Sequence, residues 1–153
     1  MPQKSVRYFL VSAAVVLFIT AAAKLISSVG GSPLLLLADP LFGVPFRLLF
    51  WIVAGVEVAV GIVCLARKRT YIQAGLLAWL GTNFAAYRIG LLLIGYHTCP
   101  CLGSLTDALR LSRHMADTIL KIVLAYLLIG SYVVLCCLWL QRRKDARVAD
   151  GRE

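Results

Sequence analysis

The sequence predicts an all-α integral membrane protein: a four-helix bundle with cytoplasmic N and C termini and a short interfacial helix in the second outer loop. The first indication is composition, since 61% of the 153 residues are hydrophobic and only 15% are charged. Mean hydropathy is +0.86, and a water-soluble domain of this size lacks the polar surface to cover so much apolar material. The other two indications are four long apolar stretches and the clustering of cations beside them.

The spans are expected at about 8–28, 44–66, 71–95 and 118–140. They form one membrane domain over 1–140, in which only helices satisfy every backbone group in lipid, and 141–153 is expected to be a disordered basic cytoplasmic tail. The first stretch follows Lys4 and Arg7 and contains Ala21-Ala22-Ala23, which is also typical of a cleaved secretory signal. Its apolar run continues past the alanines, which favours a retained helix.

The cations predict the orientation, because positive residues mark the cytoplasmic side of a membrane protein. One side collects both termini and the short loop at 67–70, with Lys4, Arg7, Arg67, Lys68, Arg69, Arg142, Arg143, Lys144, Arg147 and Arg152. The loops at about 29–43 and 96–117 then face outward from a multi-pass protein of the cell's inner (cytoplasmic) membrane. The net charge of +9 is explained by topology and anionic lipid contact, with no nucleic acid partner.

Each outer loop carries an expected local element. In the first, the run 34–37 of four leucines lies among glycines and prolines, which predicts a short apolar element that caps the bundle or offers a docking surface. In the second, Ser104-Leu105-Thr106-Asp107 has the form of a capping box and predicts the interfacial helix. The polar positions that follow are expected to form its solvated face; they are Asp107, Arg110, Arg113, His114 and Asp117.

The second outer loop also contains Cys99-Pro100-Cys101. A disulfide between residues two apart closes a tight ring, and strained, exposed disulfides are the ones that exchange readily. Exchange chemistry is therefore favoured over a static brace or a metal site. His97 lies two residues earlier, where it either manages protons for a thiol or is held at the headgroup level. His97, Cys99, Cys101 and His114 are donor types for zinc or copper, but their spacing matches no familiar zinc site, and no metal is predicted.

The other three cysteines, Cys64, Cys136 and Cys137, fall near the cytoplasmic ends of the second and fourth spans. A cysteine at this depth usually behaves as a small buried hydrophobe. Their shared depth leaves open an inner thiol pair.

Lys24, Glu57 and Arg88 form a second candidate set, because a charge at membrane depth normally faces the bundle interior and has a partner. Lys24 and Arg88 are expected in the outer half and Glu57 near the middle, where it pairs with one of the cations, unless Lys24 snorkels outward. The three charges either fix helix packing or bind a cofactor under the cysteine loop, the cations favouring thiolates and a reduced quinone. Asn83 and Tyr87 add hydrogen-bonding groups near Arg88 or serve packing alone.

These residues resemble the methylamine-utilisation MauE proteins of the DoxX-like group, which are small four-helix membrane proteins. The resemblance covers most of 8–140 and rests on the four spans, Lys24 late in the first, Glu57 within the second, and Cys99-Pro100-Cys101-Leu102-Gly103 after the third. It implies disulfide formation or electron transfer for an extracytoplasmic partner, often beside a thioredoxin-like protein. The arrangement also looks like DsbB and vitamin K epoxide reductase proteins, although this chain lacks their Cys-x-x-Cys and second outer cysteine pair.

The sequence thus predicts a membrane thiol-disulfide oxidoreductase. Cys99, Cys101 and His97 are its expected catalytic residues, and Arg88, Lys24 and Glu57 surround a quinone. Its expected partners are a thioredoxin-like or other cysteine-containing extracytoplasmic protein and membrane lipids. Two further classes are consistent with the residues: a non-enzymatic assembly factor or accessory subunit, and an outer-face metal-binding protein.

Overall fold

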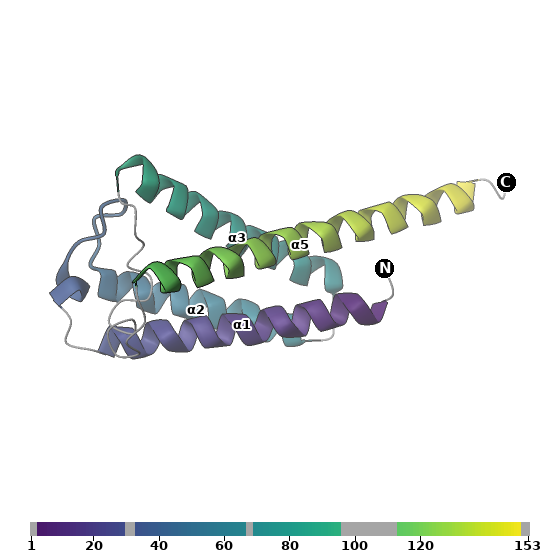
Figure 1. Cartoon of the computed structure of the whole chain (residues 1–153). Helices are drawn as coiled ribbons and strands as arrows, with labels where there is room; N and C mark the ends of the chain where they lie inside the picture. Colours follow the sequence, from purple (N-terminus) through teal and green to yellow (C-terminus); the bar gives the residue numbers. More distant parts are fainter. Residues whose placement is uncertain (1–2, 30–32, 67–68, 96–112, 151–153) are drawn as a thin grey trace.

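The computed structural model is all-α over the residues it describes, which are 3–29, 33–66, 69–95 and 113–150 (Figure 1). Its elements are α1 (Gln3–Val29), the 3-10 turn η1 (Pro33–Leu36), α2 (Phe46–Leu65), α3 (Thr70–Leu93) and α5 (Arg113–Asp150). Within these ranges there is no strand, only a single bridge between Ala38 and Pro45. Four helices are long and apolar enough to cross a membrane, which confirms the predicted class. The expected interfacial helix falls mainly on residues outside the described ranges.

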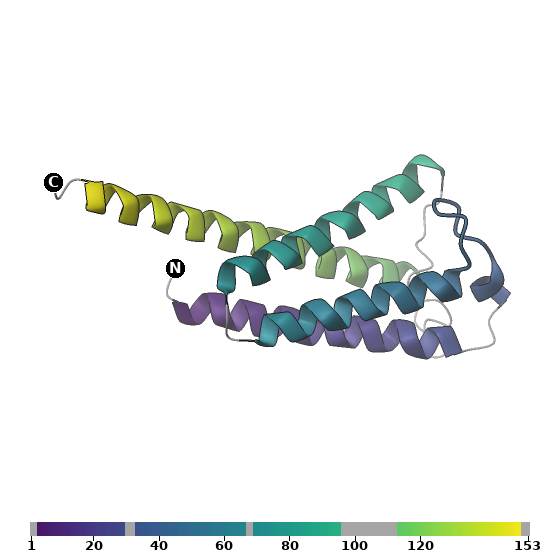
Figure 2. The same cartoon turned by 180° about the vertical axis from the view of Figure 1, so that it is seen from behind.

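Successive long helices run in opposite directions, so the start of α1 and the end of α5 lie at one end of the bundle (Figures 1 and 2). This end, here called the basic end, also contains the short connection from α2 to α3 and carries Lys4, Arg7, Arg69, Arg142, Arg143 and Lys144. The opposite end, here called the loop end, carries η1 and the loop 37–45. All described cations of the termini and of the α2–α3 connection thus lie at the basic end.

The last helix is longer than the sequence pattern predicts. We expected the fourth span to end near 140 and a disordered tail to follow, but α5 continues without a break through Asp150. Residues 141–150 contain no Gly or Pro and include several good helix formers. Extending an existing helix needs no new nucleation, so such a segment continues the helix even with nothing to bury.

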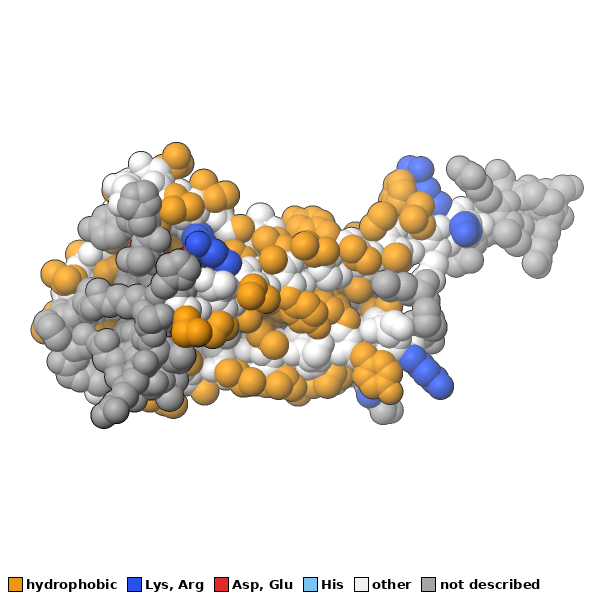
Figure 3. Space-filling model, viewed as in Figure 1, with side chains coloured by type: hydrophobic (Ala, Val, Ile, Leu, Met, Phe, Trp, Pro, Cys, Tyr) orange, Lys and Arg blue, Asp and Glu red, His pale blue; other side chains and the backbone are white. Residues whose placement is uncertain are grey.

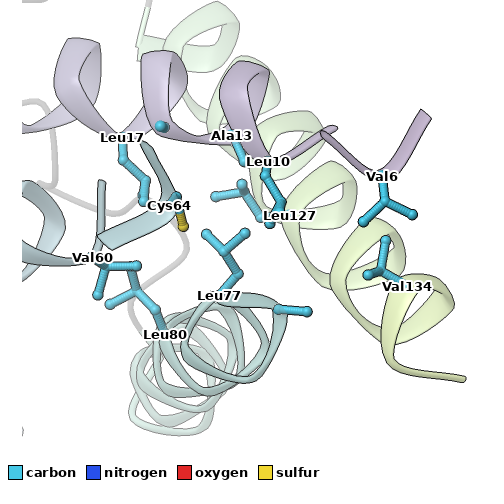
Figure 4. Packing of buried hydrophobic residues seen from close by; sticks show 12 residues of the cluster. Val6, Leu10, Ala13, Leu17, Val60, Cys64, Leu77, Leu80, Leu127 and Val134 are labelled. Atoms are coloured by element: carbon cyan, nitrogen blue, oxygen red, sulfur yellow. The ribbon is translucent and has the colours of Figure 1, made fainter. Parts of the chain in front are cut away.

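The core lies where all four long helices meet (Figure 4). Leu10 and Leu17 of α1, Val60 of α2, Leu77 of α3 and Leu127 of α5 belong to one cluster of buried apolar side chains. α1 packs mainly on α2 and α3 mainly on α5, so this cluster joins two helical pairs. A second, smaller cluster at the loop end consists of Leu35, Phe46 and Phe50, with Leu49 packed against it.

Glycines let the helices approach closely at three points. A methyl group on Gly61 of α2 would lie 3.0 Å from Phe18 of α1, and one on Gly81 of α3 would lie 3.2 Å from Leu128 of α5. On Gly130 of α5, a methyl group would overlap the ring of Phe9. Small residues serve this purpose in membrane bundles, where van der Waals contact replaces the hydrophobic effect between helices.

Large apolar side chains cover the outer surface between the two ends (Figure 3). Ile19, Ile62 and Ile129, from three different helices, are 64%, 58% and 65% exposed. Continuous apolar surface on this scale marks contact with a membrane rather than with water. The structure is therefore that of a multi-pass membrane protein.

A charged cleft at the loop end

A cleft of about 260 Å³ lies between the four long helices in their loop-end half. It forms where α3 leans away from α2 towards its C-terminal end (Figure 1), and the loop 37–45 contributes Phe42 to its wall. The helical lining residues are Leu17, Thr20, Lys24, Phe46, Leu49, Phe50, Val53, Glu57, Asn83, Phe84, Tyr87, Arg88, Leu120, Val123, Leu124 and Leu127. The structure thus brings the three predicted cofactor-binding residues, Lys24, Glu57 and Arg88, to one cleft.

Lys24 and Glu57 form an ion pair across α1 and α2. The Lys24 Nζ lies 2.7 Å from Glu57 Oε1 and 3.0 Å from Oε2, and the side chains are 12% and 1% exposed. Lys24 also lies 5.7 Å from the centre of the Phe84 ring, within the range of a cation–π contact. Lys24 therefore points into the bundle rather than snorkelling outward, and Glu57 has the cationic partner that its depth requires.

Arg88 uses a different carboxylate from the one that the sequence analysis considered. Its guanidinium donates to Asp117 of α5, and Asp117 also accepts from Lys121, one turn later, at 2.8 Å. Arg88 and Asp117 are 15% and 13% exposed, whereas Lys121 is 60% exposed. Asp117 was expected on a solvated helix face and lies instead in a partly buried ion pair that joins α3 to α5.

Asp39 holds the loop 37–45 against α3. Its buried carboxylate accepts from the backbone N–H groups of Leu41 and Phe42, at 2.9 Å each, and from the hydroxyl of Tyr87. The Phe42 and Tyr87 rings stack with centres 5.9 Å apart. Asp39 was not among the residues predicted from sequence, although Asp followed by Pro in a loop is a common signature of a side chain that caps its own turn.

Asn83 was expected either to add a hydrogen bond near Arg88 or to serve packing alone, and it donates to the Trp79 carbonyl in its own helix, at 2.8 Å. Its side chain still lines the cleft. Of the two polar neighbours named from sequence, Tyr87 ties α3 to the loop and Asn83 stays within α3.

The cleft combines two cations with aliphatic and aromatic walls. Lys24 and Arg88 supply N–H donors on α1 and α3, and each has a carboxylate partner that keeps the local charge balanced. Phe42, Phe46, Phe50 and Phe84 contribute aromatic surface. A site of this kind fits a flat, mostly apolar ring with oxygen acceptors, because the apolar walls contact the ring and the donors meet the oxygens.

The predicted catalytic residues Cys99, Cys101 and His97 lie outside the described residues. The segment that contains them, 96–112, connects the end of α3 to the start of α5. Arg88 lies in the last two turns of α3 and Asp117 in the first two turns of α5. Their ion pair therefore joins the two helices that this segment connects.

The remaining cysteines are unpaired in the described part of the chain. Cys64 is buried in the core as predicted, but Cys136 is exposed and Cys137 partly so. Cys136 therefore differs from the expected small buried hydrophobe, because its side chain lies on the outer surface of α5. Among the described side chains, no group of three or more His, Cys, Asp or Glu residues is placed to hold a metal ion.

Comparison with protein-family models, with curated proteins and with solved structures finds no match to this chain.

Proposed function

We propose that this protein is a membrane thiol-disulfide oxidoreductase that passes electrons between the thiols of an extracytoplasmic partner and a membrane quinone through Cys99 and Cys101. The observation that carries the proposal is the charged cleft. It lies at the same end of the bundle as the two helix ends that the segment 96–112 connects, and it holds Lys24 and Arg88 among aromatic walls. The resemblance to MauE and DoxX-like proteins supports the same chemistry.

The residues of the cleft fit a quinone head group as the second substrate. A quinone ring is flat and apolar, and reduction places negative charge on its oxygens. Preorganised donors in a dry site stabilise charge of this kind most effectively. Arg88 and Lys24 would donate to the oxygens, Phe42 and Phe84 would cover the ring, and Glu57 and Asp117 would balance the cations when the quinone is absent.

The proposed reaction has two balanced halves. In the first, a thiolate of the partner attacks the Cys99–Cys101 disulfide to give a mixed disulfide, and the partner's second thiol resolves it. The partner gains a disulfide, and Cys99 and Cys101 become thiols. In the second, these two thiols return to the disulfide and their two electrons and two protons convert quinone to quinol. His97 would accept and release protons beside the sulfurs.

The proposal includes an orientation. The basic end faces the cytoplasm, following the distribution of its cations, so the charged cleft and the cysteine segment face the outside of the inner membrane. Outside the cytoplasm, disulfides form and persist. The partner would be a thioredoxin-like or other cysteine-containing protein, in whose disulfide formation or maturation the chain assists.

Quinone reduction by the purified full chain tests the function. The protein is placed in lipid nanodiscs with a short-chain quinone, a thioredoxin-like dithiol protein is added, and quinol formation is followed by absorbance. Turnover is expected only when chain, dithiol and quinone are all present. A chain that shows no thiol-dependent turnover contradicts the enzyme and favours an accessory subunit, and stoichiometric zinc or copper in the purified protein favours metal binding.

Replacing Arg88 by Gln tests the role of the cleft. Because the guanidinium would stabilise charge on the reduced ring, its loss is expected to slow quinol formation by about 10²-fold. Lys121→Gln is the matched control: it removes a cation from the same Asp117 but lies outside the cleft lining. Equal rates in the two variants would exclude Arg88 from the quinone site.

A further inference from the structure

Two further clefts lie side by side at the basic end. The first, about 620 Å³, lies between α1, the α2–α3 connection and α5, and the second, about 530 Å³, lies between the start of α3 and α5. Thr70, Leu138 and Gln141 line both clefts. The two clefts therefore adjoin at these three residues, and together they are here called the groove.

Each cleft has its own pair of cations. Lys4 and Arg7 of α1 line the first, and Arg69 and Arg142 line the second. The guanidinium of Arg142 lies 5.2 Å from the centre of the Tyr71 ring, a contact that positions it over the second cleft. Among the described residues no acidic side chain lines either cleft, so this groove, unlike the charged cleft at the loop end, has no built-in counter-charge.

Hydrogen-bond donors lie on the shared wall between the two pairs. Thr70 and Gln141 carry a hydroxyl and an amide there. Thr70 is also the first residue of α3, and this helix has no side-chain cap and no acidic residue in its first turn. The positive N-terminal end of the α3 dipole therefore adds to the field of the four cations. The groove as a whole therefore favours a negatively charged ligand.

The walls point to a lipid rather than to a free anion. Val6 and Leu10 line the first cleft and are buried, while the exposed Val11 and Leu65 continue it onto the outer apolar surface. Ile72 does the same for the second cleft. The cations at this end lie beside the apolar band that faces the membrane (Figure 3). A ligand here has its charge among the cations and its hydrocarbon on the bundle surface.

We infer that this groove binds an anionic phospholipid whose head group contains two phosphodiester groups, one in each cleft. The two phosphates are assigned one to each cleft because each cleft has two cations, which suit one phosphate. The wall that the clefts share suits the short polar link between the two phosphates. Basic pockets between membrane helices bind such head groups on the cytoplasmic side. The site lies at the opposite end from the charged cleft and does not depend on the proposed redox function.

Lipid titration of the purified full chain, read by native mass spectrometry, tests this. A diphosphate lipid of the cardiolipin class is expected to bind one per chain and more tightly than phosphatidylglycerol or phosphatidylcholine. The double variants Lys4→Gln/Arg7→Gln and Arg69→Gln/Arg142→Gln are each expected to weaken it by about 30-fold. Arg143→Gln/Lys144→Gln is the matched control, because it removes two cations of the same end that line neither cleft.

Several outcomes would overturn the inference. Equal affinity in all three double variants would show only a diffuse charge effect. If two phosphatidylglycerol molecules bound as tightly as one diphosphate lipid, a head group that bridges the two clefts would be excluded. If inorganic phosphate at matched concentration displaced the lipid, the groove would be a site for a free anion and not for a lipid. Helical content measured by circular dichroism confirms that each variant is folded, so an affinity loss reports on the groove.

Discussion

Replacing Lys24 by Met is expected to destabilise the bundle by about 3–5 kcal/mol, the cost of removing one partner from a buried ion pair. Glu57 is 1% exposed and both its carboxylate oxygens receive the Lys24 ammonium. Without the lysine, this carboxylate must remain charged without a cation or take up a proton. The free energy of unfolding in mixed detergent micelles, followed by circular dichroism, measures the loss.

Two companion variants make the result specific to the pair. Lys24→Met/Glu57→Leu removes both charges and is expected to recover most of the stability, since apolar residues of similar volume commonly replace a buried pair at little cost. Lys121→Met removes an exposed cation that also has an acidic partner, and a loss under about 1 kcal/mol is expected. If the double variant were no more stable than Lys24→Met, the destabilisation would come from lost packing and not from the unpaired carboxylate.

The Lys24–Glu57 pair was partly predictable because a charge at membrane depth must have a partner. Helix directions and residue spacing placed Lys24, Glu57 and Arg88 in adjoining parts of the bundle, and the structure brings all three to one cleft. The choice of partners was not predictable, because it depends on how the helices rotate and cross. Arg88 bonds Asp117 since α3 packs mainly on α5, while Lys24 bonds Glu57 since α1 packs mainly on α2.

Asp39 shows a second limit of sequence pattern. In a loop rich in glycine and proline, an aspartate is ordinarily a solvated turn residue, but Asp39 is 1% exposed and bonds Tyr87, 48 positions away. Such a contact depends on tertiary packing, here the placement of the loop 37–45 under the splayed end of α3. The spans, in contrast, follow from composition alone, because lipid permits so few alternatives to a helix.

The two ends of the bundle handle charge differently, and the difference fits their proposed roles. At the loop end, Lys24 and Arg88 are both paired with carboxylates inside the protein. A neutral quinone can enter such a site without a large change in charge. At the basic end, the four cations of the two adjoining clefts have no acidic side chain in the lining among described residues. A permanently anionic head group suits that end and a neutral substrate suits the other.

Single replacements of Cys99 and Cys101 by Ser are each expected to abolish thiol-dependent quinol formation, the largest effect predicted for this chain. The proposed cycle needs both sulfurs, because the two-electron oxidation closes a bond between them. With one sulfur removed, the other can still attack a disulfide on a partner, displace one of its thiols and form a mixed disulfide, but it cannot complete the cycle. The measurement is quinol formation in nanodiscs, with mixed disulfides detected on non-reducing gels after reaction with a single-cysteine thioredoxin-like probe. The probe's sulfur is first converted to a mixed disulfide with an aryl thiol, so that attack by the remaining loop thiolate releases the aryl thiol and leaves the probe attached.

Cys136→Ser is the matched control, because it removes an exposed thiol of α5 and leaves both Cys99 and Cys101 in place. It should retain full turnover. At least one of the two loop variants should accumulate the mixed disulfide, which identifies the remaining sulfur as the one that contacts the partner. Turnover retained in both loop variants, with no trapped probe, would remove the cysteine pair from the reaction. If the probe were trapped but the unmodified chain formed no quinol, the cysteines would have a thiol-linked docking role. The ion pairs of the charged cleft would then serve helix packing alone.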